Sequence, residues 1–342
     1  MSKTIYYLGA GASFGKRDNN GAILEGVPIV SEIPKEYEAF KDFISNAVIP
    51  EGDIIFQDKY RTGHDNVEEA KRFMLHDIES LIQNIKEHAT IDTYARKLHL
   101  TRNRGEFKKL KDVLCAFFIW EQTDHKPDNR YDTFLANVLE AQTLNLPSDI
   151  SIISWNYDSQ IELAFKAYRR NPGLTIIEKN IVGEWPSLPR SGRIFKVNGS
   201  ATFSDLSSLS SIEHYKDSSV AVQLILYYGD LKADTSSMGF LFRTHLSFAW
   251  EEAPNHENLM NSIKATTEDT EQVVVIGYSF PFFNRETDRE IFRGMPRLKK
   301  VYIQDIHPQA VKESIQAVLP DNQMIDLVPI SNCDQFFLPK EL

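Results

Sequence analysis

The chain has 342 residues, of which 42% are hydrophobic and 25% are charged, and its formal net charge is −10 at pH 7. These values are typical of a globular protein with room for one large α/β domain or two smaller ones. The negative charge argues against a broad surface for DNA or anionic lipid, so we expect a small molecule or a protein as partner.

The cysteines and the N-terminus bear on metal binding and location. Cys115 and Cys333 lie far apart in the chain, and there is no Cys-x-x-Cys pair. This excludes a zinc ribbon, and we expect buried free thiols and no bound metal. The first residues lead directly into a strand without the apolar core of a signal peptide, and the apolar stretch 273–283 is too short to span a bilayer. We therefore expect a cytoplasmic protein that does not bind membranes.

The first structural signal is the apolar run 5–8, which ends in Gly9-Ala10-Gly11-Ala12-Ser13. Glycines permit positive φ and lack Cβ atoms, so backbone N–H groups can approach a phosphate oxygen, and a helix N-terminus adds partial positive charge. The pattern predicts a strand, a phosphate-binding turn and a helix, with Gly9, Ala10, Gly11 and Ser13 beside the ligand. The alternative is a tight turn between a strand and a helix without a ligand.

A long region after this turn has helical periodicity. Apolar side chains recur every three or four positions from Val67 to Ile85 and indicate one long amphipathic helix. The segments 108–120 and 131–144 indicate two more. We expect a helical insertion at 31–147 within an α/β domain formed by residues 1–30 and 148–342.

Strands alternate with helices in the rest of the chain. Apolar, β-prone runs predict strands at 149–154, 194–197, 220–228, 273–276 and 300–305. Helical patterns follow at 161–168, 285–292 and 311–318. This alternation predicts the α/β class, with a doubly wound, Rossmann-like parallel sheet. The serine-rich segment 204–219 lacks periodicity and is predicted to be a mobile loop.

Small or amide-bearing turns follow four of the predicted strands, at 9–13, 156–158, 198–200 and 277–279. Open α/β sheets bind ligands at the carboxyl ends of their strands. In this order the turns resemble the sirtuin-like superfamily. Residues 9–13 match its glycine motif, Asn156-Tyr157-Asp158 its catalytic Asn-x-Asp, and Gly277-Tyr278-Ser279 the turn that holds the adenosine ribose. Gly26-Val27-Pro28 is similar to the loop that encloses nicotinamide.

The resemblance extends from about Thr4 to Asp305. The helical region is similar to that of bacterial sirtuin-like NAD-cleaving proteins of antiphage defence, whereas the zinc-ribbon cysteines of the deacylases are absent. The resemblance implies NAD or ADP-ribose as ligand, a homo-oligomer, and a second defence protein as partner. The binding residues that it implies are Gly9, Ala10, Gly11, Ser13, Pro28, Gly277 and Ser279.

The matched Asn-x-Asp turn fits cleavage of the nicotinamide–ribose bond. This reaction forms an oxocarbenium-like centre and releases neutral nicotinamide, so positioning and electrostatics dominate. Asn156 could hold a water or a ribose hydroxyl beside C1′, and Asp158 could accept from the nicotinamide carboxamide. The alternatives are an Asx turn for Asn156 and a helix N-cap for Asp158. Asp305 could bind the adenosine ribose or cap the helix that Pro308 opens.

Asn198 departs from the family pattern. Where relatives carry a histidine as general base, this chain has Asn198, and asparagine does not accept a proton near neutral pH. Losing a general base costs about 10²- to 10⁴-fold in rate. A slow NAD⁺ hydrolase with Asn156, Asp158 and Asn198 at its catalytic positions is therefore the first hypothesis. The alternative is a weak or inactive sensor or scaffold subunit that binds NAD or ADP-ribose.

Overall fold

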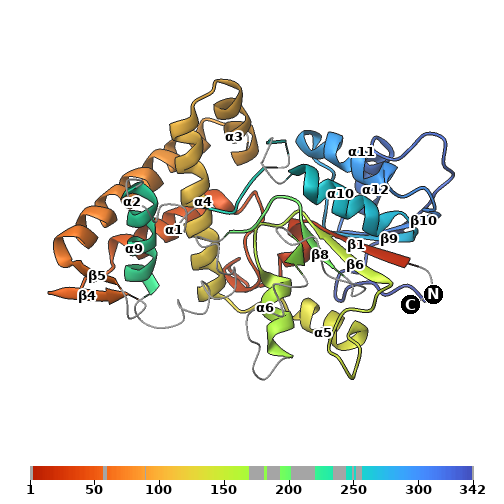
Figure 1. Cartoon of the computed structure of the whole chain (residues 1–342), viewed down its shortest axis with the longest axis horizontal. Coiled ribbons are helices and arrows are strands. Elements are labelled where there is room, and N and C mark those ends of the chain that lie inside the picture. Colours follow the sequence, from red (N-terminus) through yellow and green to blue (C-terminus); the bar gives the residue numbers. More distant parts are fainter. Residues whose placement is uncertain are drawn as a thin grey trace. The chain divides into compact units, whose positions relative to one another are not determined.

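The computed structural model describes residues 3–56, 60–88, 90–168, 181–182, 193–201, 220–233, 244–248, 250–251 and 256–340 (Figure 1). Contacts divide the chain into two compact units. The first comprises residues 1–26, 127–199 and 247–342, and the second comprises 27–126 and 200–246. These bounds differ from the predicted ones, because 127–147 joins the α/β unit, whereas 27–30 and 200–246 join the helical unit. The predicted loop 204–219 lies outside the described residues.

A parallel sheet forms the centre of the first unit. In the described chain it has seven strands in the order β11-β10-β9-β1-β6-β8-β7, and all of these pairings are parallel. The strands are β1 (Lys3–Leu8), β6 (Ile150–Ser154), β7 (Ile181–Val182), β8 (Ile194–Lys196), β9 (Thr270–Ile276), β10 (Lys300–Gln304) and β11 (Asp326–Ile330). β1 lies between β9 and β6 (Figure 1). β11, which contains Pro329, pairs only with β10 among the described strands.

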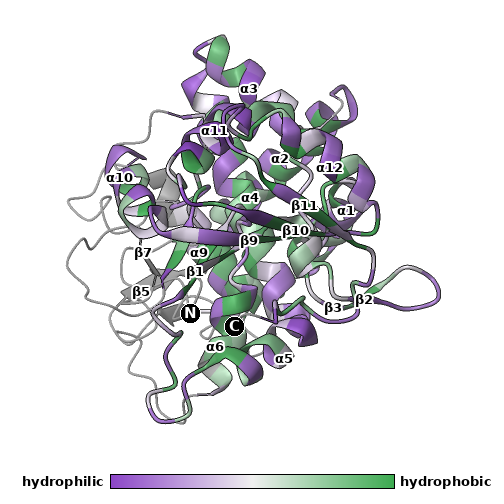
Figure 2. Ribbon diagram, turned by 90° about the vertical axis from the view of Figure 1, so that its right-hand side faces the viewer, coloured by the Kyte–Doolittle hydropathy of each residue, from purple (hydrophilic) through white to green (hydrophobic). Residues whose placement is uncertain are grey.

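Helices cover both faces of this sheet, which confirms the predicted doubly wound α/β fold. α10 (His256–Thr267), α11 (Arg285–Arg293) and α12 (Pro308–Gln316) lie on one face, and α5 (Asn129–Val138) and α6 (Gln160–Ala167) lie on the other (Figure 2). Because side chains alternate along a strand, Ile5 and Tyr7 of β1 join the apolar core beneath α10, α11 and α12. Tyr6 points the other way, and its ring lies 4.6 Å from that of Phe134 on α5.

The chain does not form the predicted α-helix after the glycine turn. Residues 10–13 form a single 3₁₀ turn, η1 (Ala10–Ser13), and an antiparallel hairpin of β2 (Lys16–Arg17) and β3 (Ile23–Glu25) follows. Gly15 has a φ of 65°, in the left-handed region that ends helical geometry. The helix prediction was therefore wrong, and no helix dipole of useful length points out of this turn.

The second unit is mainly helical. Its described elements are α1 (Ile33–Ser45), α2 (His64–Lys86), α3 (Ile91–Leu100), α4 (Arg104–Asp124), α9 (Val220–Ala233) and the hairpin of β4 (Asp53–Phe56) and β5 (Tyr60–Gly63). α2 and α4 confirm the helices predicted around 67–85 and 108–120. The helix predicted at 131–144 is α5 and ends at Val138. Nowhere in the described chain is a helix both long and apolar enough to cross a bilayer.

The strand predicted at 220–228 was wrong, because this segment belongs to α9. α9 packs against α1, α2 and α4, so residues on several of its sides are apolar. A helix that is hydrophobic all round has no periodic stripe, and its β-branched and aromatic residues resemble those of a buried strand.

An aromatic cluster in the core of the second unit generates a stability prediction. Phe117 of α4 is fully buried, and its ring lies 4.4 Å from Tyr37 and 5.9 Å from Phe40 of α1. We expect Phe117→Ala to lower the free energy of unfolding by about 3–5 kcal/mol, because it removes a buried ring and leaves a cavity. Phe73→Ala is the matched control, since Phe73 is 52% exposed. Urea unfolding followed by circular dichroism measures both, and equal losses would contradict this packing.

Candidate functional site

Most predicted site residues lie at one edge of the parallel sheet. β1, β6, β8, β9 and β10 point the same way, so the loops that follow them leave at their shared carboxyl edge. These loops contain Gly9, Ala10, Gly11, Ser13, Asn156, Asp158, Asn198, Gly277, Ser279 and Asp305. Pro28 belongs to the second unit, where it is buried. The edge is where ligands bind in open α/β sheets.

The glycines of the first turn permit a close approach to the loop after β9. The backbone N–H of Gly11 donates to Gly277 O at 3.0 Å. A Cβ atom on Gly11 would lie 2.8 Å from Gly277 Cα, and one on Gly9 would lie 2.6 Å from Gly277 O. Gly277 itself has a φ of 58°. Contact between the two loops therefore accounts for these glycines.

Among Gly9, Ala10, Gly11 and Ala12, one residue keeps an available backbone donor. Gly9, Gly11 and Ala12 donate their N–H groups to Ile276 O, Gly277 O and Gly9 O. Ala10 forms the exposed tip of the turn, and none of the described residues accepts from its N–H. A phosphate oxygen could bind at Ala10, but the turn does not present the set of converging donors that a phosphate cradle has.

Asn156 and Asp158 meet the first turn at the buried hydroxyl of Ser13. Ser13 Oγ lies 3.0 Å from the Tyr131 hydroxyl, 3.1 Å from Asp158 Oδ1 and 3.0 Å from Asn156 Nδ2. Asn156 Nδ2 also donates to Gly9 O at 2.9 Å. The predicted glycine turn and Asn-x-Asp turn are thus joined by side-chain hydrogen bonds, and Tyr131 is a member of the network that the sequence did not indicate.

These bonds fix the orientation of the Asn156 amide. A carbonyl oxygen such as Gly9 O can only accept, so the amide nitrogen must face it. Both amide hydrogens then have partners, Gly9 O and Ser13 Oγ. Asn156 Oδ1 accepts from none of the residues that the structure describes. It is an oriented hydrogen-bond acceptor at the sheet edge.

Asp158 is held by the protein in a capping arrangement. Its Oδ1 accepts from the backbone N–H of Gln160 at 3.0 Å, at the start of α6, and from Ser13 Oγ. Burial raises the pKa of this carboxyl, and the nearby Lys196 ammonium opposes that rise. These contacts match the helix-cap alternative more closely than a free acceptor for a ligand.

A buried lysine supports the same loop. Lys196 Nζ donates to the main-chain carbonyl of Asp158 and lies 3.4 Å from Glu162 Oε1. The side chains of Lys196 and Glu162 are 5% and 2% exposed. Removing one partner of a buried ion pair leaves an uncompensated charge, so both groups are needed for the loop geometry. The sequence placed Lys196 in a strand but gave no sign of these partners.

Asn198 is also bound to the backbone. Its Nδ2 donates to Trp155 O at 2.8 Å, and its own carbonyl accepts from the Ser247 N–H at 2.9 Å. Trp155 directly precedes Asn156. Asn198 therefore braces the loop that carries Asn156, and its amide offers no proton acceptor.

Ser279 and Asp305 lie on the neighbouring loops. Ser279 is exposed, which leaves it accessible to a ligand. Asp305 Oδ1 accepts from the His307 N–H at 2.8 Å, directly before Pro308 and α12. This bond closes a turn before the helix, whereas α12 has His307 at its N-cap and no side-chain cap, so Asp305 does not cap the helix. No hydrogen bond between described residues joins Ser279 or Asp305 to Asn156.

An aspartate–arginine pair, which the sequence did not reveal, clamps the glycine turn. Arg130 Nη2 lies 2.5 Å from Asp128 Oδ2 and donates to Gly11 O at 2.9 Å. Asp128 Oδ2 accepts from the Gly15 N–H at 2.8 Å. Asp128 before α5 is recognisable as a helix cap, but its contact with a turn far away in sequence has no local signal.

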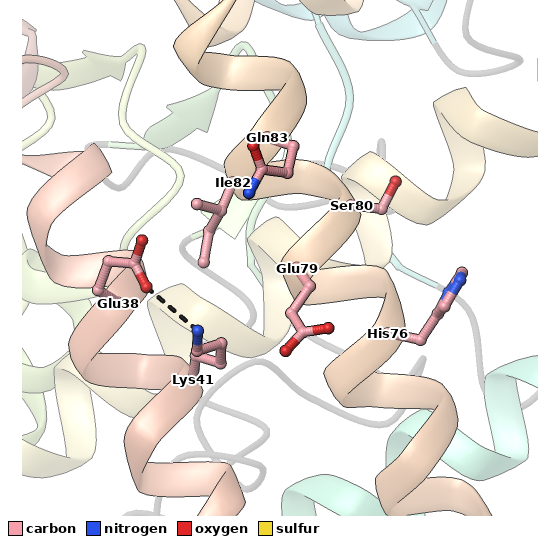
Figure 3. Close-up of a pocket in the computed structure, with 7 residues that line it drawn as sticks. All are labelled: Glu38, Lys41, His76, Glu79, Ser80, Ile82 and Gln83. Carbon is pink, nitrogen blue, oxygen red and sulfur yellow. Dashed lines mark ion pairs between the residues drawn. The ribbon is translucent and has the colours of Figure 1, made fainter.

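A separate polar cavity of about 330 Å³ lies in the second unit, between α1 and α2 (Figure 3). It is lined by Glu38, Lys41, His76, Glu79, Ser80, Ile82 and Gln83. Glu38 and Lys41 form an ion pair at 3.4 Å. None of the predicted site residues lines this cavity.

Together, the fold and its edge define an α/β protein with a Rossmann-like parallel sheet and an ordered polar network where its strands end. No family model matches the chain, and no curated protein matches it. In the part of the chain that the structure describes, no group of three or more His, Cys, Asp or Glu residues is placed to hold a metal.

The contact between the glycine loops predicts a strong effect of one methyl group. We expect Gly11→Ala to lower the free energy of unfolding by about 1–3 kcal/mol, because the new Cβ overlaps the Gly277 backbone. Gly105→Ala is the matched control. A Cβ there has no neighbour within 4 Å, and in helix α4 alanine is favoured over glycine. Thermal unfolding of both variants tests this, and a Gly11→Ala protein as stable as the control would disprove the close approach.

Proposed function

We propose that the chain binds NAD⁺ or ADP-ribose at the carboxyl edge of its parallel sheet and hydrolyses NAD⁺ to nicotinamide and ADP-ribose. One observation carries the proposal: the Asn156 amide is locked with its oxygen as the remaining acceptor. An oriented acceptor suits a ribose hydroxyl or a water, since both donate. The exposed Ala10 at the tip of the neighbouring turn supplies a donor for a phosphate oxygen.

The reaction needs little covalent chemistry from the protein. The oxygen of a water molecule bonds to C1′ of the ribose while the C1′–nitrogen bond breaks. Nicotinamide leaves with the bonding electron pair as a neutral molecule, and the water loses one proton to solvent. Asn156 Oδ1 would orient the water or the ribose and stabilise positive charge as it develops at C1′.

Hydrolysis by this site is expected to be slow. Asn198 cannot accept a proton, and the Asp158 carboxylate is bonded to the Ser13 hydroxyl and the start of α6. Without a general base, the rate falls by about 10²- to 10⁴-fold.

A second candidate function is a nucleotide sensor or scaffold subunit that binds NAD or ADP-ribose without cleaving it. The specific support for it is that Asn198 cannot accept a proton and that the Asp158 carboxylate is already bonded to the Ser13 hydroxyl and the start of α6. The resemblance to sirtuin-like proteins of antiphage defence supports a role in such defence for either candidate. It also supports self-assembly, a second defence protein as partner and a cytoplasmic location.

One assay on four proteins tests the proposed function. Wild type, Asn156→Ala, Asn198→His and Asn137→Ala are incubated with NAD⁺, and nicotinamide and ADP-ribose are followed by chromatography. Asn137→Ala is the matched control, because Asn137 is exposed on α5. We expect slow cleavage by wild type and control, slower cleavage by Asn156→Ala, and faster cleavage by Asn198→His, since an imidazole restores a proton acceptor near neutral pH.

The contrary outcomes are equally clear. If no protein cleaves NAD⁺ but wild type binds ADP-ribose in calorimetry and Asn156→Ala does not, the sensor replaces the hydrolase. If neither nucleotide binds to wild type, the assignment of the sheet edge as a nucleotide site is wrong.

A further inference from the structure

A buried carboxyl group lies behind the candidate site, and neither the glycine turn nor the Asn156 network uses it directly. Asp288 of α11 is fully buried. Its Oδ1 accepts from the Tyr7 hydroxyl at 2.5 Å, and its Oδ2 accepts from the Tyr278 hydroxyl at 3.0 Å. Asn284 Nδ2 in turn donates to the Tyr278 hydroxyl at 3.1 Å. The carboxyl thus connects β1, the loop after β9 and α11.

The two tyrosines identify the form of this carboxyl that the network fits. The Tyr278 oxygen accepts from Asn284, so its own proton is directed to Asp288. Tyr7 also donates to Asp288, and hydrogen bonds donated to a carboxyl group favour its ionised form. Protonating Asp288 would place two protons in one of these contacts and force a hydroxyl to turn away.

The network reaches the candidate site through Trp155. The rings of Tyr278 and Trp155 are stacked, with centroids 5.4 Å apart and an interplanar angle of 9°. Trp155 directly precedes Asn156, and its carbonyl accepts from Asn198. A shift of Tyr278 therefore moves the residue to which both site asparagines are attached.

We propose that Asp288 is a positioning residue of the candidate nucleotide site: its ionised carboxylate fixes Tyr278, and Tyr278 fixes Trp155 and the loop that follows. That the ligand of this site is a nucleotide rests on the proposed function. The link from Asp288 to Trp155 is independent of any ligand. It makes nucleotide affinity depend on whether Asp288 is ionised.

The surroundings of Asp288 put its titration in the neutral range. Burial raises its pKa to about 7, while the hydroxyls of Tyr7 and Tyr278 and the charge of Arg285 on the same helix lower it. Burial and the carboxylate together raise the pKa of both tyrosines well above their usual range, so the phenols keep their protons. α10, which packs against α11, adds the apolar Met260 and Ile263 to the shared core. Asp288 is thus the group in this network that titrates near pH 7.

The first arm of the test uses the ligand-free protein. Tryptophan fluorescence is recorded across two pH units on either side of 7, and the contribution of Trp155 is obtained by subtracting the signal of Trp155→Phe. We expect a transition near pH 7 in wild type and in Glu290→Gln, a control that neutralises an exposed carboxylate on the same helix. Asp288→Asn keeps the shape of the side chain but cannot ionise, so the transition should disappear.

A second variant guards against poor folding of Asp288→Asn. Tyr278→Phe keeps the stacked ring but removes the hydroxyl through which the Asp288 carboxylate holds it. The Trp155 transition should therefore be lost in this variant, although its Asp288 can still ionise. A transition that persists unchanged in Asp288→Asn or in Tyr278→Phe overturns the proposal.

The second arm measures ADP-ribose affinity by calorimetry at the two ends of the same pH range. Because one pKa unit of coupling equals a tenfold change in affinity, we expect wild type and Glu290→Gln to bind roughly three- to tenfold tighter at the basic end. Asp288→Asn should bind equally at both ends. If its affinity keeps the wild-type pH dependence, Asp288 does not position the site. If wild type binds no nucleotide at any pH, the proposed function fails, and the fluorescence arm alone decides whether Asp288 controls Trp155.

Discussion

The site geometry depends on a steric constraint between two backbones. The loops after β1 and β9 meet where Gly11 N donates to Gly277 O at 3.0 Å, and a side chain on either glycine would overlap the other loop. This contact follows from the parallel pairing of the two strands, whose ends leave the sheet together. It also places Tyr278, the next residue, against Tyr7 and Trp155. The two loops therefore form one packed platform.

Buried polar groups extend this platform across the sheet edge. Ser13, Asn156 and Asp158 bond to one another, and Lys196 and Asn198 bond to the carbonyls of the loop around them. A buried polar group without a hydrogen-bond partner is costly, because the dielectric constant of the interior is low. A network whose groups bond to one another fixes a single geometry. The consequence for chemistry is that few atoms stay available to a ligand. Asn156 Oδ1 stands out among them.

The extent to which sequence predicted the fold depended on burial. Central parallel strands are covered on both faces and appear as short apolar runs, so β1, β6, β9 and β10 were predictable. The amphipathic α2 was predictable from its single apolar stripe. β11, with Asp326 and Pro329 in five residues, has no such run, and α9 has no stripe because it is buried on several sides. β11 was missed because Asp and Pro are uncommon in strands, and α9 was missed because burial on several sides removes the apolar stripe that marks a helix.

The candidate site was predictable only in part for a different reason. Motifs predicted which loops lie at the sheet edge, because the turn residues follow their strands directly. They could not predict that Arg130 would bind Gly11 O or that Asp288 would bind Tyr7, because those pairs form only when distant segments fold together. Likewise, the glycines were interpreted as a phosphate cradle, but most of their N–H groups bond to neighbouring carbonyls.

The proline in β11 limits growth of the sheet by addition of further chains. The Asp326 N–H donates to Lys299 O, directly before β10, and Ile330 O accepts from the Asp305 N–H, directly after β10. Because strand residues alternate, Leu327 and Pro329 direct their backbone groups outward. Pro329 has no N–H to donate on that outer side. The missing N–H does not weaken the pairing of β11 with β10, because that pairing uses the groups on the inner side. β11 is the outermost described strand on this side, so a strand from another molecule would meet an interrupted row of hydrogen-bonding groups there, a feature that disfavours edge-to-edge aggregation.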